Sequence, residues 1–181
     1  TLLEGLHDRD RALEQLKKCL RDSGGKLTTG FVGTPFLCGI LSDNGMEKEA
    51  FELLLNEEYP GWLYEVKLGA TTIWERWNSL DENGHISSTG MNSLNHYTYG
   101  SVTAWLFRYV GGLKMCEEKP GYRYVEIRPL VNWKLRFVKL RYPSAYGTYE
   151  VEWKIKDPTH VYLRIVVPYQ AQAKVILPGK E

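Results

Sequence analysis

This sequence lacks most of the features that mark metal centres, disulfide frameworks, membrane spans and nucleotide sites. Its three cysteines are an odd number at wide spacing, which fits neither a disulfide framework nor a structural zinc site: Cys19, Cys38 and Cys116. The apolar runs are too short and too interrupted to span a bilayer. No phosphate-binding loop, dinucleotide fingerprint, HExxH zinc motif or nucleophile elbow occurs. We therefore expect no cofactor, no metal site and no membrane partner.

Neither sign of charge dominates the chain either. The formal net charge is +1, so there is no basic field to hold a nucleic acid backbone, and we expect no nucleic acid partner. Free thiols favour a reducing compartment such as the cytoplasm. The chain opens at Thr1 without an initiator methionine, which suggests a truncated N-terminus and a missing stretch where any export signal would lie.

What the chain does have is enough apolar material for a packed core: 43% of its 181 residues are hydrophobic and 13% are aromatic. Its first half shows helical periodicity, with Ala12, Leu13, Leu16 and Leu20 on one face and a Gly24-Gly25 stop after it. Further helices are expected over 31–41, with Pro35 in the first turn, and over 46–56 and 94–109. Residues 59–92 have no clear period and carry glycines and aromatic anchors, which is typical of a functional segment.

The last third reads as β-structure. Apolar and polar residues alternate over 148–155, and turn residues separate short β-like runs at 122–127, 135–142, 147–155, 161–167 and 173–177. We expect an antiparallel β-sandwich, with a boundary near residues 116–121. The predicted organisation is a helical domain over 1–117 and a β-sandwich over 118–181.

The segment Gly69 to Ser79 is the strongest candidate for chemistry because it places Glu75 between Trp74 and Trp77. A carboxylate can activate a water, and the apolar face of a sugar ring packs on an indole, so Glu75 is a candidate general base in a carbohydrate enzyme. The alternative is a structural glutamate paired with Arg76 or another base. Trp74 and Trp77 are candidate sugar contacts, although each could equally be a core residue.

His96 is the second candidate. Its neighbours Asn95, Tyr97 and Tyr99 supply donors and acceptors suited to sugar hydroxyls, whereas a lone histidine can also be a hydrogen-bonded structural residue. His85 lies in a predicted turn with Asp81 and Glu82, where a solvated turn is favoured over a metal site.

Taken in order, several motifs resemble the C-terminal part of bacterial α-L-rhamnosidases, glycoside hydrolase family 78. The resemblance covers nearly the whole chain and rests on long, ordered motifs: Thr29-Gly30-Phe31-Val32-Gly33-Thr34-Pro35, Glu57-Glu58-Tyr59-Pro60-Gly61-Trp62-Leu63-Tyr64, Gly69-Ala70-Thr71-Thr72-Ile73-Trp74-Glu75-Arg76-Trp77, Met91-Asn92-Ser93-Leu94-Asn95-His96-Tyr97, Pro120-Gly121-Tyr122 and Ile127-Arg128-Pro129.

The resemblance implies the closing helices of an (α/α)6 barrel followed by a C-terminal β-sandwich, and hydrolysis of terminal α-L-rhamnosyl linkages with inversion. It implies that Glu75 is the general base and that His96 contacts rhamnose. The family's general acid lies in an acidic, glycine-containing motif of an earlier barrel loop, and this chain has no match for that motif. We therefore expect a fragment that needs the N-terminal portion of the same enzyme as a partner and that is inactive alone.

Two other functions stay open. The aromatic residues could belong to a non-catalytic carbohydrate-binding module, or to a helical-barrel glycosidase for another sugar. Barrel helices without their neighbours would expose an apolar face, so self-association is expected and light scattering would detect it.

Overall fold

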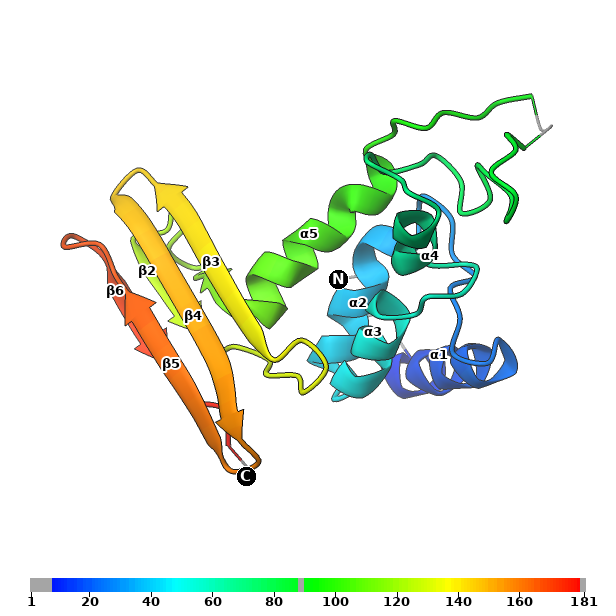
Figure 1. The fold of residues 1–181 in the computed structure, drawn as a ribbon. Coiled ribbons are helices and arrows are strands. Elements are labelled where there is room, and N and C mark those ends of the chain that lie inside the picture. The colour runs from blue at the N-terminus through cyan, green and yellow to red at the C-terminus, as the bar shows by residue number, and fades with distance from the viewer. Residues whose placement is uncertain (1–7, 88–89, 180–181) are drawn as a thin grey trace. The chain divides into compact units, whose positions relative to one another are not determined.

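The structure is a computed structural model that describes residues 8–87 and 90–179, and its backbone divides into two compact units, Thr1–Val102 and Thr103–Glu181. The first unit holds helices and a long irregular segment, and the second holds most of the strands (Figure 1). Each unit is described by itself below.

Three helices of the first unit follow the periodicity of the sequence: α1 (Arg9–Asp22), α2 (Thr34–Asp43) and α3 (Glu47–Leu54). Helix α1 begins after Asp8, whose carboxylate accepts the backbone N–H of Arg11 at 3.3 Å, because aspartate is a favoured N-cap. It ends at Asp22, and Gly24 and Gly25 just after it both take a positive φ, as the predicted glycine stop requires.

Helix α2 starts later than the sequence indicated. The predicted helix over 31–41 was wrong at its start, because residues 31–33 form a turn and the helix begins at Thr34, whose backbone N–H donates to Gly30 O at 3.0 Å. Pro35 sits in the first turn, where a missing N–H costs nothing. The buried face of α2 includes Cys38 and packs against α3. Burial raises the pKa of the Cys38 thiol to about 12, so it serves as a packed apolar group.

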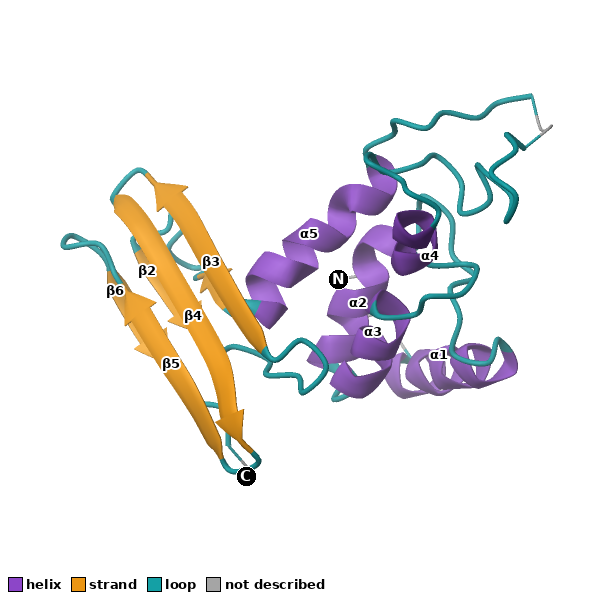
Figure 2. Ribbon diagram, viewed as in Figure 1, coloured by secondary structure: helices purple, strands orange, loops and turns teal. Residues whose placement is uncertain are grey.

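The segment predicted to be irregular over 59–92 contains a short helix, α4 (Trp62–Lys67), so that prediction was wrong over these residues. The described chain after α4 is a long loop (Figure 2). A helical run follows, with a 3₁₀ turn η1 (Thr98–Ser101), an α-helical turn α5 (Val102–Trp105) and a π-helical turn η2 (Leu106–Val110). The helix predicted over 94–109 therefore begins four residues late, at Thr98.

The second unit contains two three-stranded sheets. One has the order β1-β2-β6, formed by β1 (Leu113–Met115), β2 (Tyr124–Ile127) and β6 (Gln172–Val175). The other is an antiparallel meander of β3 (Phe137–Ser144), β4 (Gly147–Asp157) and β5 (His160–Val166). Strand β2 pairs with β6 in parallel, with Val125 opposite Ala173, so one pairing departs from the antiparallel pattern.

The two sheets of this unit share one hydrophobic core, as a sandwich requires. Its fully or nearly buried members come from both sheets: Leu113, Val125, Ile127, Leu140, Tyr149 and Val151. Two polar atoms of the core are satisfied by backbone carbonyls, since Tyr149 Oη donates to Tyr122 O at 2.7 Å and Trp153 Nε1 donates to Val110 O at 2.8 Å. Among the helices within residues 8–87 and 90–179, none is long and apolar enough to cross a membrane.

Candidate active site

The two candidate residues lie on backbone segments that hydrogen-bond to each other within the first unit. The backbone N–H of Glu75 donates to Ser93 O at 2.9 Å, and the backbone N–H of His96 donates to Ile73 O at 2.8 Å. The Thr72 hydroxyl adds a bond to Leu94 O. We call this short antiparallel pairing of residues 73–75 with residues 93–96 the clamp. It brings Glu75 and His96 together through backbone N–H and C=O groups, which do not depend on the side chains.

The side chain of Glu75 is the predicted general base. Its side chain is half-buried, and among the residues that the structure describes it has neither an ion-pair nor a hydrogen-bond partner. The structural alternative from the sequence, an ion pair with Arg76, is not formed here. Because the side chain is only half-buried, a water can hydrate the carboxylate in place of a protein partner.

His96 is fixed in both orientation and tautomer. Its ring stacks on Phe31 with the ring centroids 4.9 Å apart, and the backbone N–H of Thr98 donates to its Nδ1 at 3.3 Å. The Thr98 hydroxyl also lies 3.1 Å from Nδ1. A backbone N–H can only donate, so its bond favours the neutral tautomer in which Nδ1 accepts and Nε2 carries the hydrogen. The half-buried imidazole therefore presents one N–H donor, the group that would bind a sugar oxygen.

The two candidate indoles are buried, with 2% of Trp74 and 8% of Trp77 exposed. Trp77 stacks on Tyr99 at a centroid distance of 3.8 Å and meets Trp62 edge to face at 5.3 Å, and its Nε1 donates to Thr29 O at 3.2 Å. These contacts give the Trp77 ring a packing role. The sugar contact predicted for both indoles stays a prediction, and it would require the rings to become accessible.

Sequence reasoning missed Glu65, which lies on α4 and is only 2% exposed. Its Oε2 accepts the backbone N–H of Trp74 at 3.3 Å, directly before Glu75, while its Oε1 has no partner within the described residues. Burial raises the pKa of Glu65 to about 7, and the hydrogen bond from Trp74 acts in the opposite direction. Because its carboxyl group is enclosed, Glu65 has no path to a leaving group and supports the backbone instead.

Ser79 was missed as well, and it is completely buried. Its Oγ accepts the backbone N–H of Arg76 at 3.1 Å, and its carbonyl accepts both the Asn92 side-chain amide at 2.9 Å and the backbone N–H of Ser87 at 3.0 Å. The turn after Glu75 is thereby tied to the returning chain. The local sequence around Glu65 or Ser79 does not predict this role, because both residues bind groups that are distant in the sequence.

The pKa of Glu65 makes the stability of the first unit depend on pH. Its value lies above the ordinary 4.5, so the stability it contributes is complete below pH 4.5 and is lost as pH rises through about 7. We expect urea unfolding to show a loss of about 3 kcal/mol in the free energy of unfolding between pH 4.5 and pH 8, since one pKa unit corresponds to about 1.4 kcal/mol. Glu65→Gln should abolish this part of the pH dependence.

The matched control for that measurement is Glu52→Gln, because Glu52 is an exposed glutamate on α3. The free energy of unfolding of Glu52→Gln should depend on pH as that of the wild-type chain does. An identical slope in wild type and Glu65→Gln would mean that Glu65 is already ionised in the folded state.

His85 occupies the turn expected from the sequence, and its backbone N–H and its ring both contact the Asp81 carboxylate, the backbone N–H at 2.8 Å and Nδ1 at 3.3 Å. Over the described ranges, no three His, Cys, Asp or Glu side chains gather in a way that could hold a metal ion.

Comparison with known proteins agrees with this architecture. The family model for the bacterial alpha-L-rhamnosidase 6 hairpin glycosidase domain matches residues 1–110, and that for the bacterial alpha-L-rhamnosidase C-terminal domain matches residues 112–181. A curated alpha-L-rhamnosidase of Formosa agariphila is 35% identical over 94% of this chain, and one of Streptomyces avermitilis is 34% identical over 94%. The chain spans 18% and 16% of those two relatives.

Solved structures give the same result. The crystal structure of Streptomyces avermitilis alpha-L-rhamnosidase complexed with L-rhamnose matches 96% of this chain and 16% of its own, with a TM-score of 0.88 and 33% identity. The alpha-L-rhamnosidase of Aspergillus terreus matches 97% of this chain and 20% of its own, with a TM-score of 0.90 and 33% identity.

The fold is thus that of a six-hairpin glycosidase domain followed by a β-sandwich domain, which confirms the predicted fold class. The chain belongs to the bacterial α-L-rhamnosidase family.

Proposed function

We propose that this chain carries the general-base half of an inverting glycosidase site that releases terminal α-L-rhamnose. In this reaction Glu75 removes a proton from a water as that water attacks the anomeric carbon, and a separate carboxylic acid protonates the departing oxygen from the other face of the sugar. His96 Nε2–H donates a hydrogen bond to the bound rhamnose. Rhamnose-containing glycosides are the proposed substrates.

The observation that carries the proposal is the partner-free carboxylate of Glu75 on a segment clamped to that of His96, in a chain of this family. General-base catalysis requires a carboxylate that is accessible to water and positioned against it, and the clamp fixes the backbone that carries Glu75. Trp74 and Trp77 support the site from below, and their direct contact with the sugar stays a prediction.

The general acid of the site is proposed to lie in another part of the enzyme, outside the barrel helices that this chain contains. Glu65 has the raised pKa of an acid catalyst, but its burial excludes contact with a leaving group. The remainder of the same enzyme is therefore the proposed partner of this chain. The self-association expected from the sequence stays a prediction; apolar side chains that the first unit exposes include Val32 and Met91.

The experiment compares this chain alone with a chimera in which it replaces the matching segment of the Streptomyces avermitilis relative. On 4-nitrophenyl α-L-rhamnoside we expect no turnover above background from the chain alone, because half of the carboxylate pair is missing, and clear turnover from the chimera. Turnover by the chain alone at a rate close to that of the relative would refute the half-site. A folded but inactive chimera would refute the rhamnosidase function.

A carbohydrate-binding module without chemistry is the second candidate, and the exposed side chains of Asn95 and Tyr97 beside His96 favour it. It predicts retained rhamnose binding together with no dependence of turnover on Glu75. A glycosidase for another sugar predicts that the chimera loses its preference for rhamnosides.

A further inference from the structure

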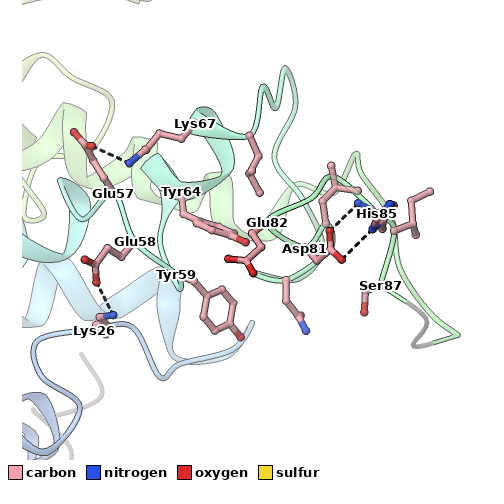
Figure 3. A pocket seen from close by; sticks show the side chains of 14 residues that line it. Lys26, Glu57, Glu58, Tyr59, Tyr64, Lys67, Asp81, Glu82, His85 and Ser87 are labelled. Atoms are coloured by element: carbon pink, nitrogen blue, oxygen red, sulfur yellow. Dashed lines mark hydrogen bonds and ion pairs between the residues drawn. The ribbon is translucent and has the colours of Figure 1, made fainter.

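An open cavity in the first unit is lined by residues other than those of the clamp of Glu75 and His96. It measures about 950 Å³ and lies between two stretches of chain, one around α4 and one around the turn at Asp81 (Figure 3). Its volume is at the upper end of the range found for small-molecule sites. Asn78 lines it and lies only three positions after Glu75 in the same irregular segment.

Two tyrosines give the cavity an aromatic wall. The rings of Tyr59 and Tyr64 meet edge to face with their centroids 5.6 Å apart, and Tyr59 is 48% exposed. Neither phenol hydroxyl has a hydrogen-bond partner in the part of the chain that the structure describes, although both rings line the cavity. Such a wall can pack against the C–H face of a pyranose while its hydroxyls bond to the sugar's edge.

The charged groups of the cavity are mostly occupied already. Lys26 pairs with Glu58 at 2.8 Å and Lys67 pairs with Glu57 at 3.3 Å, while Asp81 accepts the backbone N–H groups of the following turn (Figure 3). No lysine of the lining is therefore left to neutralise an anionic ligand.

The lining side chains that are still free to bind a ligand are either neutral or hydrogen-bond acceptors. The carboxylate of Glu82 and the side-chain amide of Asn78 line the cavity, and neither has a partner within residues 8–87 and 90–179. Burial, followed by the negative charge of Glu82 and Asp81, raises the pKa of Tyr64, so its phenol stays a hydrogen donor at neutral pH. A ligand that suits these groups has hydroxyl donors, one apolar face and no negative charge.

We propose that this cavity is a saccharide subsite that binds a neutral pyranose through Tyr59, Tyr64, Asn78 and Glu82. Resting on the proposed function, it would hold the sugar to which the terminal rhamnose is attached. The carboxylate of Glu82 accepts a sugar hydroxyl, the amide of Asn78 bonds a second one, and the Tyr59 ring covers the apolar face. Uronic acids are rejected because Glu82 and Asp81 would face their carboxylate without a free cation.

The test is a titration of the whole chain, labelled with ¹⁵N, with methyl β-D-glucopyranoside and with the matching methyl glucuronide. We expect saturable shifts at the amides of Tyr64, Asn78 and Glu82 with millimolar affinity for the glucoside, and binding of the glucuronide at least about tenfold weaker. Tyr59→Ala should weaken the glucoside about tenfold, since it removes the exposed face of the wall. Glu82→Gln should reduce the discrimination against the glucuronide.

Tyr169→Ala is the matched control, because Tyr169 is a fully exposed tyrosine in the second unit, and it should bind as wild type does. Equal binding of the two glycosides would overturn the proposal, as would the absence of saturable shifts or shifts confined to Glu75 and His96. Because this readout needs no turnover, an inactive chimera with binding at the cavity would refute only the rhamnosidase function. An active chimera without that binding would refute only the subsite.

Discussion

Glu75→Gln in the chimera should lower kcat on 4-nitrophenyl α-L-rhamnoside about 1,000-fold and leave KM nearly unchanged, because general-base assistance contributes about 10²–10⁴ to a rate. The amide keeps the shape of the side chain but no longer accepts a proton from the attacking water. Sodium azide, which attacks without losing a proton, should restore part of the lost rate.

Glu52→Gln on α3 provides the control for the loss of one glutamate charge, and it should retain the full kcat. An unchanged kcat in Glu75→Gln would remove Glu75 from the chemistry and favour the binding-module alternative. A large loss that azide does not restore would assign Glu75 to substrate positioning instead.

Gly112→Ala should destabilise the second unit by about 3–5 kcal/mol. Gly112 has a φ of +78°, where an L-residue is strained, and a Cβ built there would collide with the backbone of Arg128 and with Pro129 N. The collision is with main chain that cannot move away, because the Arg128 N–H donates to Gly112 O at 2.9 Å. Urea unfolding followed by circular dichroism would measure the loss.

Gly121→Ala separates backbone strain from collision in the same unit. Gly121 also has a positive φ, +99°, but a Cβ there meets nothing within 4 Å. We expect about 1–2 kcal/mol from strain alone. Equal losses in the two variants would show that the contact with Arg128 adds nothing, and a Gly112→Ala chain as stable as wild type would mean that the turn rearranges.

The parts of the fold that local patterns control were predictable from the sequence. The apolar face of α1 and its glycine stop gave a helix that the structure confirms, and the alternation over 148–155 gave β4 with Tyr149, Val151 and Trp153 facing inward. The start of α2 was predicted wrongly because apolar Phe31 and Val32 suggest a buried helix, whereas the hydroxyl of Thr34 bonds back to the turn and sets the first residue.

Features that depend on partners distant in the sequence could not be predicted in this way. Strand β1 is too short to show alternation, and the parallel pairing of β2 with β6 has no local signature. The candidate residues Glu75 and His96 stood out by residue type and neighbours, but the clamp between them consists of backbone hydrogen bonds. The role of Glu65 depends on Trp74 N–H, nine positions away. The boundary predicted near residues 116–121 stays a prediction.

Backbone hydrogen bonds at Glu75 and His96 join the two ends of the loop between Trp77 and Asn92. The length of this loop can therefore change without breaking those bonds. Lengthening such a loop adds only a slowly growing entropic cost. This loop supplies four of the residues that line the cavity: Asn78, Asp81, Glu82 and His85. Changes in the length or sequence of this loop would reshape the cavity and leave the backbone hydrogen bonds at Glu75 and His96 in place.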